Sequence, residues 1–246
     1  MNDTAPFLEA TDSLDRDAPA LRAALARVAA GAGDDVERAV RIHDFVRDQV
    51  EFGWAPTFDA GRASETLARR IGFCNTKTPL FVSMLRAAGI PARIHFAGID
   101  TRLLAPLIAP RGPYVDHSYA EVLLGDRWLH VDSYIVDLPF HRAALERLRA
   151  SGRTIGFGIH SRGRPTWDGR SDSFVQFVND GSSPALSDVD FGIHADVPAF
   201  YATGKARTPR NPLFRLLVLR PVLAAANRRV RAIRASAEPR PASRSS

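Results

Sequence analysis

The stretch HSYAEVLLGDRWLHVD, from His117 to Asp132, decides how this chain folds, because it has the pattern of two strands joined by a tight turn. Gly125-Asp126 suits a two-residue type II′ hairpin turn. With position 124 opposite position 127, position 119 lies opposite 132 and position 117 opposite 134. Asp132 is then the diagonal neighbour of His117 on one face of the hairpin. The pattern predicts a carboxylate and an imidazole within reach of each other.

The two faces of this hairpin differ in polarity. The face that carries His117 and Asp132 also carries Tyr119, Glu121, Trp128 and His130. The opposite face is uniformly apolar, with Ala120, Val122, Leu124, Leu129 and Val131. We expect the apolar face to pack on the core. We expect His117 and Asp132 to point toward a helix that covers the other side.

Cys74 is the only cysteine in the 246 residues, and it precedes a predicted amphipathic helix over residues 75–88. Apolar side chains recur there at steps of three and four, and Gly89 marks the end. Unpaired N–H groups at a helix start favour a thiolate and can hold an oxyanion. Gly72 would let the backbone turn sharply and leave the sulfur accessible. A buried cysteine that merely begins a helix is the alternative.

A thiol, an imidazole and a carboxylate, in this chain order, are the groups that acyl transfer through a thioester needs. At this point the motifs resemble the core of the transglutaminase-like superfamily of papain-like thiol enzymes, as a short, single-domain member of bacterial type. The resemblance runs from about Val36 to Asp137. It is carried by segments that occur together and in order, namely 72–74, 85–93, 117–122 and 128–132.

The resemblance implies an α+β fold, with helices packed on an antiparallel sheet and the nucleophile at a helix N-terminus. It implies that Cys74 is the nucleophile, that His117 is the general base and that Asp132 orients the imidazole. Several relatives place an aromatic residue upstream of the nucleophile to help hold the oxyanion. Trp54 is therefore a candidate for oxyanion or substrate contacts, although a core position is favoured for it. Tyr119, on the face of His117, is a second candidate.

The expected function is cysteine-dependent acyl transfer to an amine, or hydrolysis, of a peptide or protein amide through a thioester. The alternative is a catalytically inactive module of the same fold, which binds a partner through a basic tail. Calcium dependence is not inherited, because no Asp-rich loop has calcium-ligand spacing. His160 and His194 lack partners at metal-ligand spacing. We predict no metal and no cofactor.

Composition and charge suggest how the chain is organised. An apolar content of 45% suits one domain with elaborations. We expect a catalytic domain over 1–204, with its core at about 36–137 and an elaboration at 138–204, and a basic tail over 205–246. The tail carries one Lys, ten Arg and one Glu, a net charge of +10, so residues 1–204 carry −4 of the total +6.

The basic tail leaves two interpretations open. An amphipathic helix that starts at Pro221 could lie on an anionic membrane or a partner, or it could pack on the domain. Apart from Phe214, the arginines lack interleaved aromatics, so nucleic acid is not expected as a partner. No secretory signal or membrane-spanning apolar stretch is found, and a free thiol is easiest to keep reduced in the cytoplasm. We expect a cytoplasmic protein, with peripheral membrane attachment as the alternative.

The remaining elements follow from periodicity and capping residues. We expect helices at 20–30, 34–50 and 138–150, and strands at 92–97 and 173–179. His43 should be a core histidine, and His141 should be exposed. The connection over 98–115, rich in leucine, could wall the active cleft or simply pack on the core.

Overall fold

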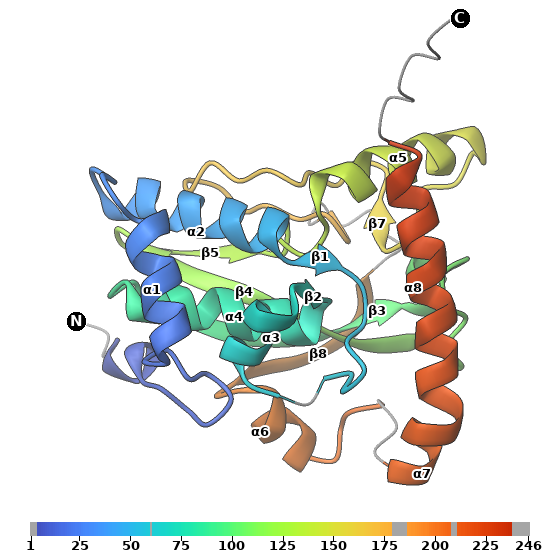
Figure 1. Ribbon diagram of the computed structural model, residues 1–246, viewed down its shortest axis with the longest axis horizontal. Helices are drawn as coiled ribbons and strands as arrows, with labels where there is room; N and C mark the ends of the chain where they lie inside the picture. The colour runs from blue at the N-terminus through green and yellow to red at the C-terminus, as the bar shows by residue number, and fades with distance from the viewer. Residues whose placement is uncertain (1–3, 60, 179–185, 208–210, 238–246) are drawn as a thin grey trace, which may run out of the picture.

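The computed structural model, which describes residues 4–59, 61–178, 186–207 and 211–237, has an antiparallel sheet at its centre (Figure 1). The strand order in this sheet is β5-β4-β3-β8. Two short pairs, β1 with β2 and β6 with β7, lie outside it. The strands are β1 Glu51–Phe52, β2 Ile71–Gly72, β3 Ala92–Asp100, β4 Tyr114–Leu124, β5 Arg127–Val131, β6 Ile155–Gly156, β7 Ile159–His160 and β8 Leu186–His194.

Helices cover this sheet and its edges (Figure 1). The α-helices are α1 Pro19–Val28, α2 Asp35–Gln49, α3 Ala63–Arg69, α4 Cys74–Ala87, α5 Leu138–Ala150, α6 Val197–Ala202, α7 Pro212–Phe214 and α8 Arg220–Ala235. Short 3₁₀ helices span Ala5–Leu8 and Thr101–Leu104, and a π-helical turn spans Arg215–Leu219. Helix α4 packs on β3 and β4, α1 and α2 pack on α4, and α5 packs on α8. The predicted α+β class is confirmed.

Helix α2 illustrates how local sequence sets the elements. The Asp34 carboxylate caps it by accepting the Glu37 N–H at 2.7 Å. Its inner face is buried, and His43 on that face is fully buried. The Nε2 atom of His43 lies 2.8 Å from the Ser133 hydroxyl. His43 is therefore a core histidine, as predicted.

The hairpin forms in the predicted register. Leu124 pairs with Arg127 and Ala120 with Val131, and Gly125 has a φ of 63°, as a type II′ turn requires. The five apolar side chains of the predicted core face are all buried.

The prediction that a helix covers the face of His117 is wrong. Helix α4 packs on the apolar face of the sheet, and aromatic side chains from residues 155–177 cover the polar face. The Phe177 ring meets the His117 ring edge-on at 5.8 Å, and the Phe174 ring meets that of Tyr119 at 6.0 Å.

The predicted strand over 173–179 does not form in the described residues 173–178, and Asn179 lies outside the described ranges. Ser173 alone forms a bridge, to Val131. The Val175 N–H, which a strand ladder would use, is donated to the Asp132 carboxylate instead. Strand β8, which pairs with β3, was not predicted.

Helix α5 has the predicted bounds, but His141 on it is buried, not exposed, and burial lowers its pKa to about 4. Helix α8 lies against α5 with its apolar face in the core, through Leu223, Ala226, Val230 and Ile233. Arg234 reaches back to the Asp137 carboxylate at 2.7 Å. The sequence left two interpretations of the tail open, and packing on the domain is the one that fits the apolar face of α8. No helix in the described ranges is long and apolar enough to cross a membrane.

Candidate active site

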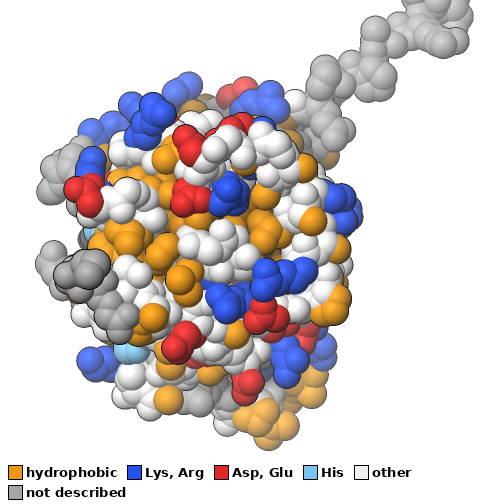
Figure 2. All heavy atoms as spheres, turned by 90° about the vertical axis from the view of Figure 1, so that its left-hand side faces the viewer, with side chains coloured by type: hydrophobic (Ala, Val, Ile, Leu, Met, Phe, Trp, Pro, Cys, Tyr) orange, Lys and Arg blue, Asp and Glu red, His pale blue; other side chains and the backbone are white. Residues whose placement is uncertain are grey.

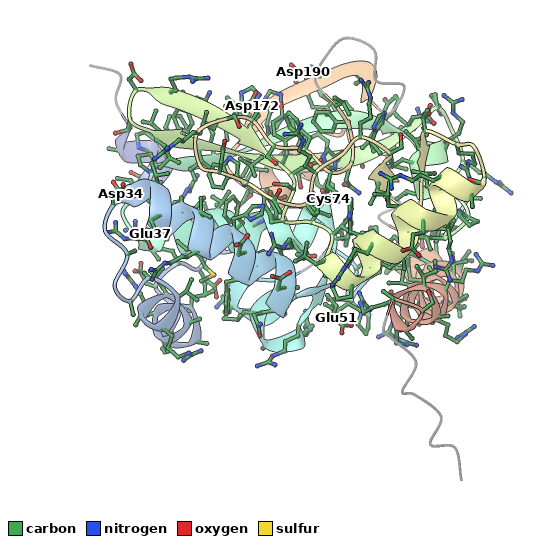
Figure 3. All side chains as sticks on the ribbon, turned by 90° about the horizontal axis from the view of Figure 1, so that it is seen from above. Asp34, Glu37, Glu51, Cys74, Asp172 and Asp190 are labelled. Carbon is green, nitrogen blue, oxygen red and sulfur yellow. The ribbon has the colours of Figure 1, made fainter. Side chains whose placement is uncertain are left out.

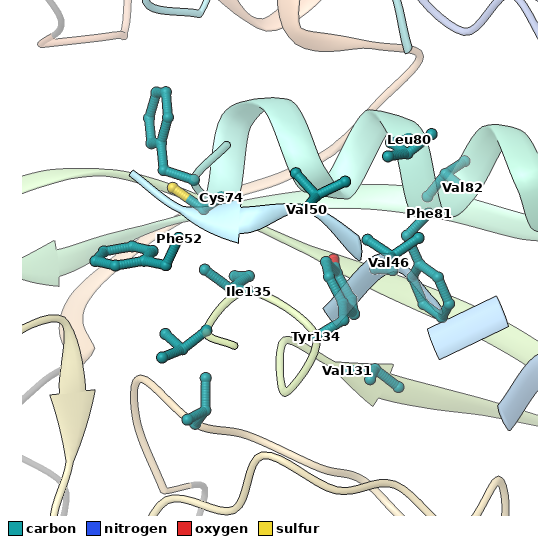
Figure 4. Close-up of a cluster of buried hydrophobic side chains, with 14 of the residues drawn as sticks. Val46, Val50, Phe52, Cys74, Leu80, Phe81, Val82, Val131, Tyr134 and Ile135 are labelled. Carbon is teal, nitrogen blue, oxygen red and sulfur yellow. The ribbon is translucent and has the colours of Figure 1, made fainter. Parts of the chain in front are cut away.

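Cys74 is the first residue of α4 and is 9% exposed. Figure 4 shows it where the helix begins, beside Phe52 and Ile135. The Thr76 hydroxyl caps this end, since its oxygen accepts the Phe73 N–H at 3.0 Å. The first N–H groups of a helix have no intrahelical acceptor. Those of Cys74 and Asn75 can therefore serve as donors to a bound oxyanion.

Gly72 is not the sharp turn that the sequence suggested. It lies in the short strand β2, outside the left-handed region of backbone conformation. A Cβ atom there would lie 2.7 Å from the Thr76 hydroxyl and 2.9 Å from the Lys77 Cγ. Glycine is required at this position because β2 approaches the first turn of α4 closely.

Lys77, one turn into α4, is fully buried. Its ammonium donates to the carbonyls of Val50 at 2.6 Å and Arg47 at 3.2 Å. Burial lowers its pKa to about 7. Lys77 therefore ties the first turn of α4 to the end of α2, a role that the sequence did not reveal.

His117 lies on β4 and is fully buried. Its Nε2 atom is 3.4 Å from the Asp132 Oδ2, the distance of a loose ion pair. The other Asp132 oxygen, Oδ1, accepts the Val175 N–H at 2.5 Å. Neither ring nitrogen of His117 meets hydrogen-bond geometry with a described group. Asp132 is thus anchored on one oxygen and faces His117 with the other.

The charge on His117 depends on Asp132 and Cys74. Burial is the largest influence and opposes the charge, but the Asp132 carboxylate and the Cys74 thiol outweigh it and raise the pKa of His117 to about 9. The imidazole is therefore protonated at neutral pH. Since Nε2 faces Asp132, Nδ1 is the nitrogen left for the sulfur.

The two further candidates occupy different places. Trp54 lines the cavity that contains Cys74, and its backbone N–H and C=O are both held by the Asn227 side chain, at 2.9 and 2.8 Å. Tyr119 stacks behind the His117 ring, with ring centroids 6.2 Å apart, and does not line that cavity. The structure brings together Cys74, His117 and Asp132, places Trp54 at their cavity and leaves Tyr119 behind it.

This cavity has a volume of about 560 Å³. Seen from above, Cys74 lies toward the middle of the molecule, and the labelled Asp34, Glu37 and Asp190 lie farther out (Figure 3). The connection over 98–115 supplies Leu103, Leu104 and Ile108 to the cavity wall, as the sequence allowed. The other lining residues are Phe52, Phe58, Phe73, Asn75, Ile99, Ala109, Pro110, Arg111, Tyr114, Val115, Asp116, His117, Gln176, Arg207, Phe214, Val218, Leu219, Val222 and Leu223.

Two further features of the site were missed from the sequence. Asn75 is 2% exposed and lines the cavity, where its Nδ2 donates to the Tyr201 hydroxyl at 3.1 Å while its Oδ1 has no partner among described groups. Its position directly after Cys74 was the available signal. The Val175 N–H, which holds Asp132, had none, because a backbone donor leaves no mark on residue type. Within the described ranges no three His, Cys, Asp or Glu side chains could hold a metal ion.

Comparisons with known proteins find similarity over part of the chain. No curated protein matches the chain. Among solved structures, a candidate cysteine protease from Cytophaga hutchinsonii is 23% identical, with 53% of this chain and 41% of that chain covered, at a TM-score of 0.43. The alignment thus spans less than half of that chain. The family model of the transglutaminase-like superfamily matches residues 22–133, which include Cys74, His117 and Asp132. This stretch of the chain is therefore similar to the core of the transglutaminase-like superfamily.

Proposed function

We propose that Cys74, His117 and Asp132 form a catalytic triad that transfers or hydrolyses acyl groups through a thioester on Cys74. One observation carries the proposal. A fully buried imidazole has a carboxylate 3.4 Å from one nitrogen, and a thiol raises its pKa in concert with that carboxylate. A cation held beside a sulfur favours the thiolate, which is the reactive form of cysteine.

The reaction follows from these positions. The Cys74 Sγ attacks the carbonyl carbon, and the negative charge that develops on oxygen is held by the N–H groups at the start of α4. The C–N bond of the amide breaks, and the His117 imidazolium gives its proton to the leaving amine. A second amine or water then attacks the thioester and loses a proton to His117, which frees the thiol. Transfer and hydrolysis differ only in this acceptor.

Asp132 acts through His117. Its anchored Oδ1 fixes the direction of Oδ2, so the imidazole is held in one orientation and its charged form is stabilised. Asn75 adds an amide beside the nucleophile, with an unpartnered oxygen able to accept a donor from the substrate.

The proposal is tested by the reactivity of the single thiol. Cys74 should react with iodoacetamide at pH 6 at least about tenfold faster than a model thiol, since the thiolate is the nucleophile. Mass spectrometry after incubation with an amide library and a primary amine should show an acyl adduct on Cys74 and reveal the acceptor. The matched control is Cys74→Ala.

The opposite outcome would point to an inactive binding module. Alkylation at the rate of a model thiol, no acyl adduct, and a Cys74→Ala protein that retains the cellular role would together contradict the proposed triad.

A further inference from the structure

Beyond the proposed triad and Asn75, the polar residues that line the cavity at Cys74 are Arg111, Tyr114, Asp116, Gln176 and Arg207. Most of its lining residues are apolar, and they include Phe52, Trp54, Leu219 and Leu223. Among the polar lining residues, Asp116 already accepts the Arg207 N–H at 2.9 Å, and Gln176 donates to the Gly158 carbonyl at 2.9 Å. The volume of about 560 Å³ lies within the usual range of small-molecule sites, about 300–1,000 Å³.

A peptide main chain would be a poor occupant of such a space. Each buried N–H and C=O needs a partner, and leaving one without a partner has a free-energy cost. An unbranched hydrocarbon chain needs none and gains from burial. We propose that the acyl substrate of Cys74 carries a long apolar chain, which fills this cavity. This inference rests on the proposed function and names its substrate class.

The mouth of the cavity supports this assignment. Phe214, Val218 and Val222 line the cavity and are also 40%, 46% and 45% exposed to solvent. We call residues 212–222 the rim helix. Its outer side adds Leu213, Leu216 and Leu217, which are 66%, 51% and 69% exposed and do not line the cavity. Apolar side chains of the rim helix therefore both line the cavity and face solvent beside it.

Exposed apolar residues grouped in this way mark a surface that contacts another apolar phase. In Figure 1 the rim helix begins at α7, at the lower end of the molecule. Figure 2 views the molecule from the side away from α8 and shows charges of both signs mixed with apolar side chains on that face.

The charge of the surrounding C-terminal residues indicates what kind of surface the rim helix contacts. Residues 205–246 have a net charge of +10. Arg220 in the rim helix is exposed, as are Arg228 and Arg231 farther along α8. Basic side chains beside inserted apolar ones complement anionic lipid headgroups. The rim helix docks on an anionic lipid surface, from which the apolar chain enters the cavity.

The chemical step is unchanged. The Cys74 Sγ forms a bond to the acyl carbon of the lipid-like substrate, and the amide or ester bond breaks as His117 protonates the leaving group. Water or an amine then releases the acyl chain and returns a proton to His117. No other reactant is needed.

A ladder of p-nitrophenyl esters, from acetyl through butyryl and octanoyl to dodecanoyl, measures the preference for chain length. The value of kcat/KM should rise roughly fourfold per added methylene until the cavity is filled. Ile108→Trp, which fills the cavity, should lower the dodecanoyl-to-acetyl ratio at least tenfold. The matched control, Ile193→Trp, adds the same indole at an apolar site on β8 that is 43% exposed and lies outside the cavity.

Binding without chemistry separates the two proposals. Dodecanamide should bind Cys74→Ala and change the fluorescence of Trp54 in the cavity wall, whereas acetamide should not. A flat ester ladder on an enzyme that does acylate Cys74, with no dodecanamide binding, would overturn the apolar substrate and leave the triad standing. Chain binding without any acylation would support the ligand class and contradict the triad.

Vesicles test the lipid surface. The protein should bind phosphatidylglycerol vesicles more tightly than phosphatidylcholine ones, and Leu217→Glu should weaken that binding about tenfold or more. Ile193→Glu is the matched control. Equal binding of Leu217→Glu and Ile193→Glu would overturn the docking surface and leave a freely dissolved acyl compound as the source of the chain.

Discussion

The two faces of strands β3 and β4 are almost equally buried but chemically opposite. Ile94 and Val122 on the face toward α4 are fully buried, and so is His117, while Glu121 on its own face is 2% exposed. Burial therefore does not distinguish the structural residues of these strands from the candidate catalytic ones. What differs is the satisfaction of polar groups, since Glu121 is held by Arg93 at 2.6 Å whereas His117 has no well-formed hydrogen bond. Incompletely satisfied buried groups mark functional positions.

The largest expected effect separates two histidines that both lie on the polar face. His117→Asn should slow acylation of Cys74 by about 10⁴-fold or more, because the base and acid are lost together. His95→Asn should slow it less than about threefold, because His95 is bound to Glu121 at 2.6 Å and to Asp190 at 2.7 Å, away from the sulfur. Single-turnover acylation rates measure both. Equal losses would remove the distinction between satisfied and unsatisfied histidines.

Asp132→Asn should produce the next largest effect, a fall of about 10³-fold in kcat. The amide oxygen can still accept the Val175 N–H, so the side chain stays in place while its negative charge is lost. The pKa of His117 should fall, because Asp132 is the largest influence that raises it. The pH profile of kcat and the NMR titration of His117 measure this. The control is Asp172→Asn at the exposed edge, where that carboxylate accepts the His130 N–H; a similar loss there would contradict the assignment.

The hairpin could be predicted from the sequence because its geometry is local. A two-residue turn at Gly125 and strict alternation set the register, and the register alone places Asp132 diagonal to His117. Helix α4 was equally readable, because a three-four apolar period runs along it and Gly89 follows its end. The transglutaminase-like resemblance depended on the same short segments.

What covers these elements could not be predicted, because it depends on contacts between distant parts of the chain. Phe177 reaches His117 from sixty residues away in sequence, and β8 joins β3 from a region rich in glycine and serine. His141 appeared exposed by helix periodicity alone, and it is buried in the structure. The apolar positions of α8 were correctly identified, but only the structure shows that α5 and the core cover them.

Ile94→Ala tests the apolar face of the sheet, which packs on α4. Removing a fully buried side chain from β3 should lower the free energy of unfolding by about 2–4 kcal/mol, through lost burial and a residual cavity. The value of kcat for the folded protein should change less than about twofold. Urea unfolding and kinetics together measure this, with Ile193→Ala as the exposed control. A large loss of kcat at full folding would mean that the two faces are not independent.

The smallest expected effect is the pH dependence of stability. The pKa of His117 is raised to about 9, so its charge stabilises the fold fully below about pH 6.5, the ordinary value, and this stabilisation is lost as the pH rises through 9. Lys77, whose pKa is lowered to about 7, acts in the opposite direction above pH 7. The wild type and His117→Asn both contain Lys77. The contribution of Lys77 therefore cancels in the difference between their free energies of unfolding.

That difference in the free energy of unfolding should be constant up to about pH 6.5 and fall by about 1–3 kcal/mol by pH 10. Adding Cys74→Ala to both proteins should shrink the fall, because the thiol contributes to the raised pKa of His117. A difference that grows with pH would mean that burial, rather than Asp132 and Cys74, governs the imidazole. His117 would then be neutral at pH 7, as the equally buried His43 is in the core, where burial lowers its pKa.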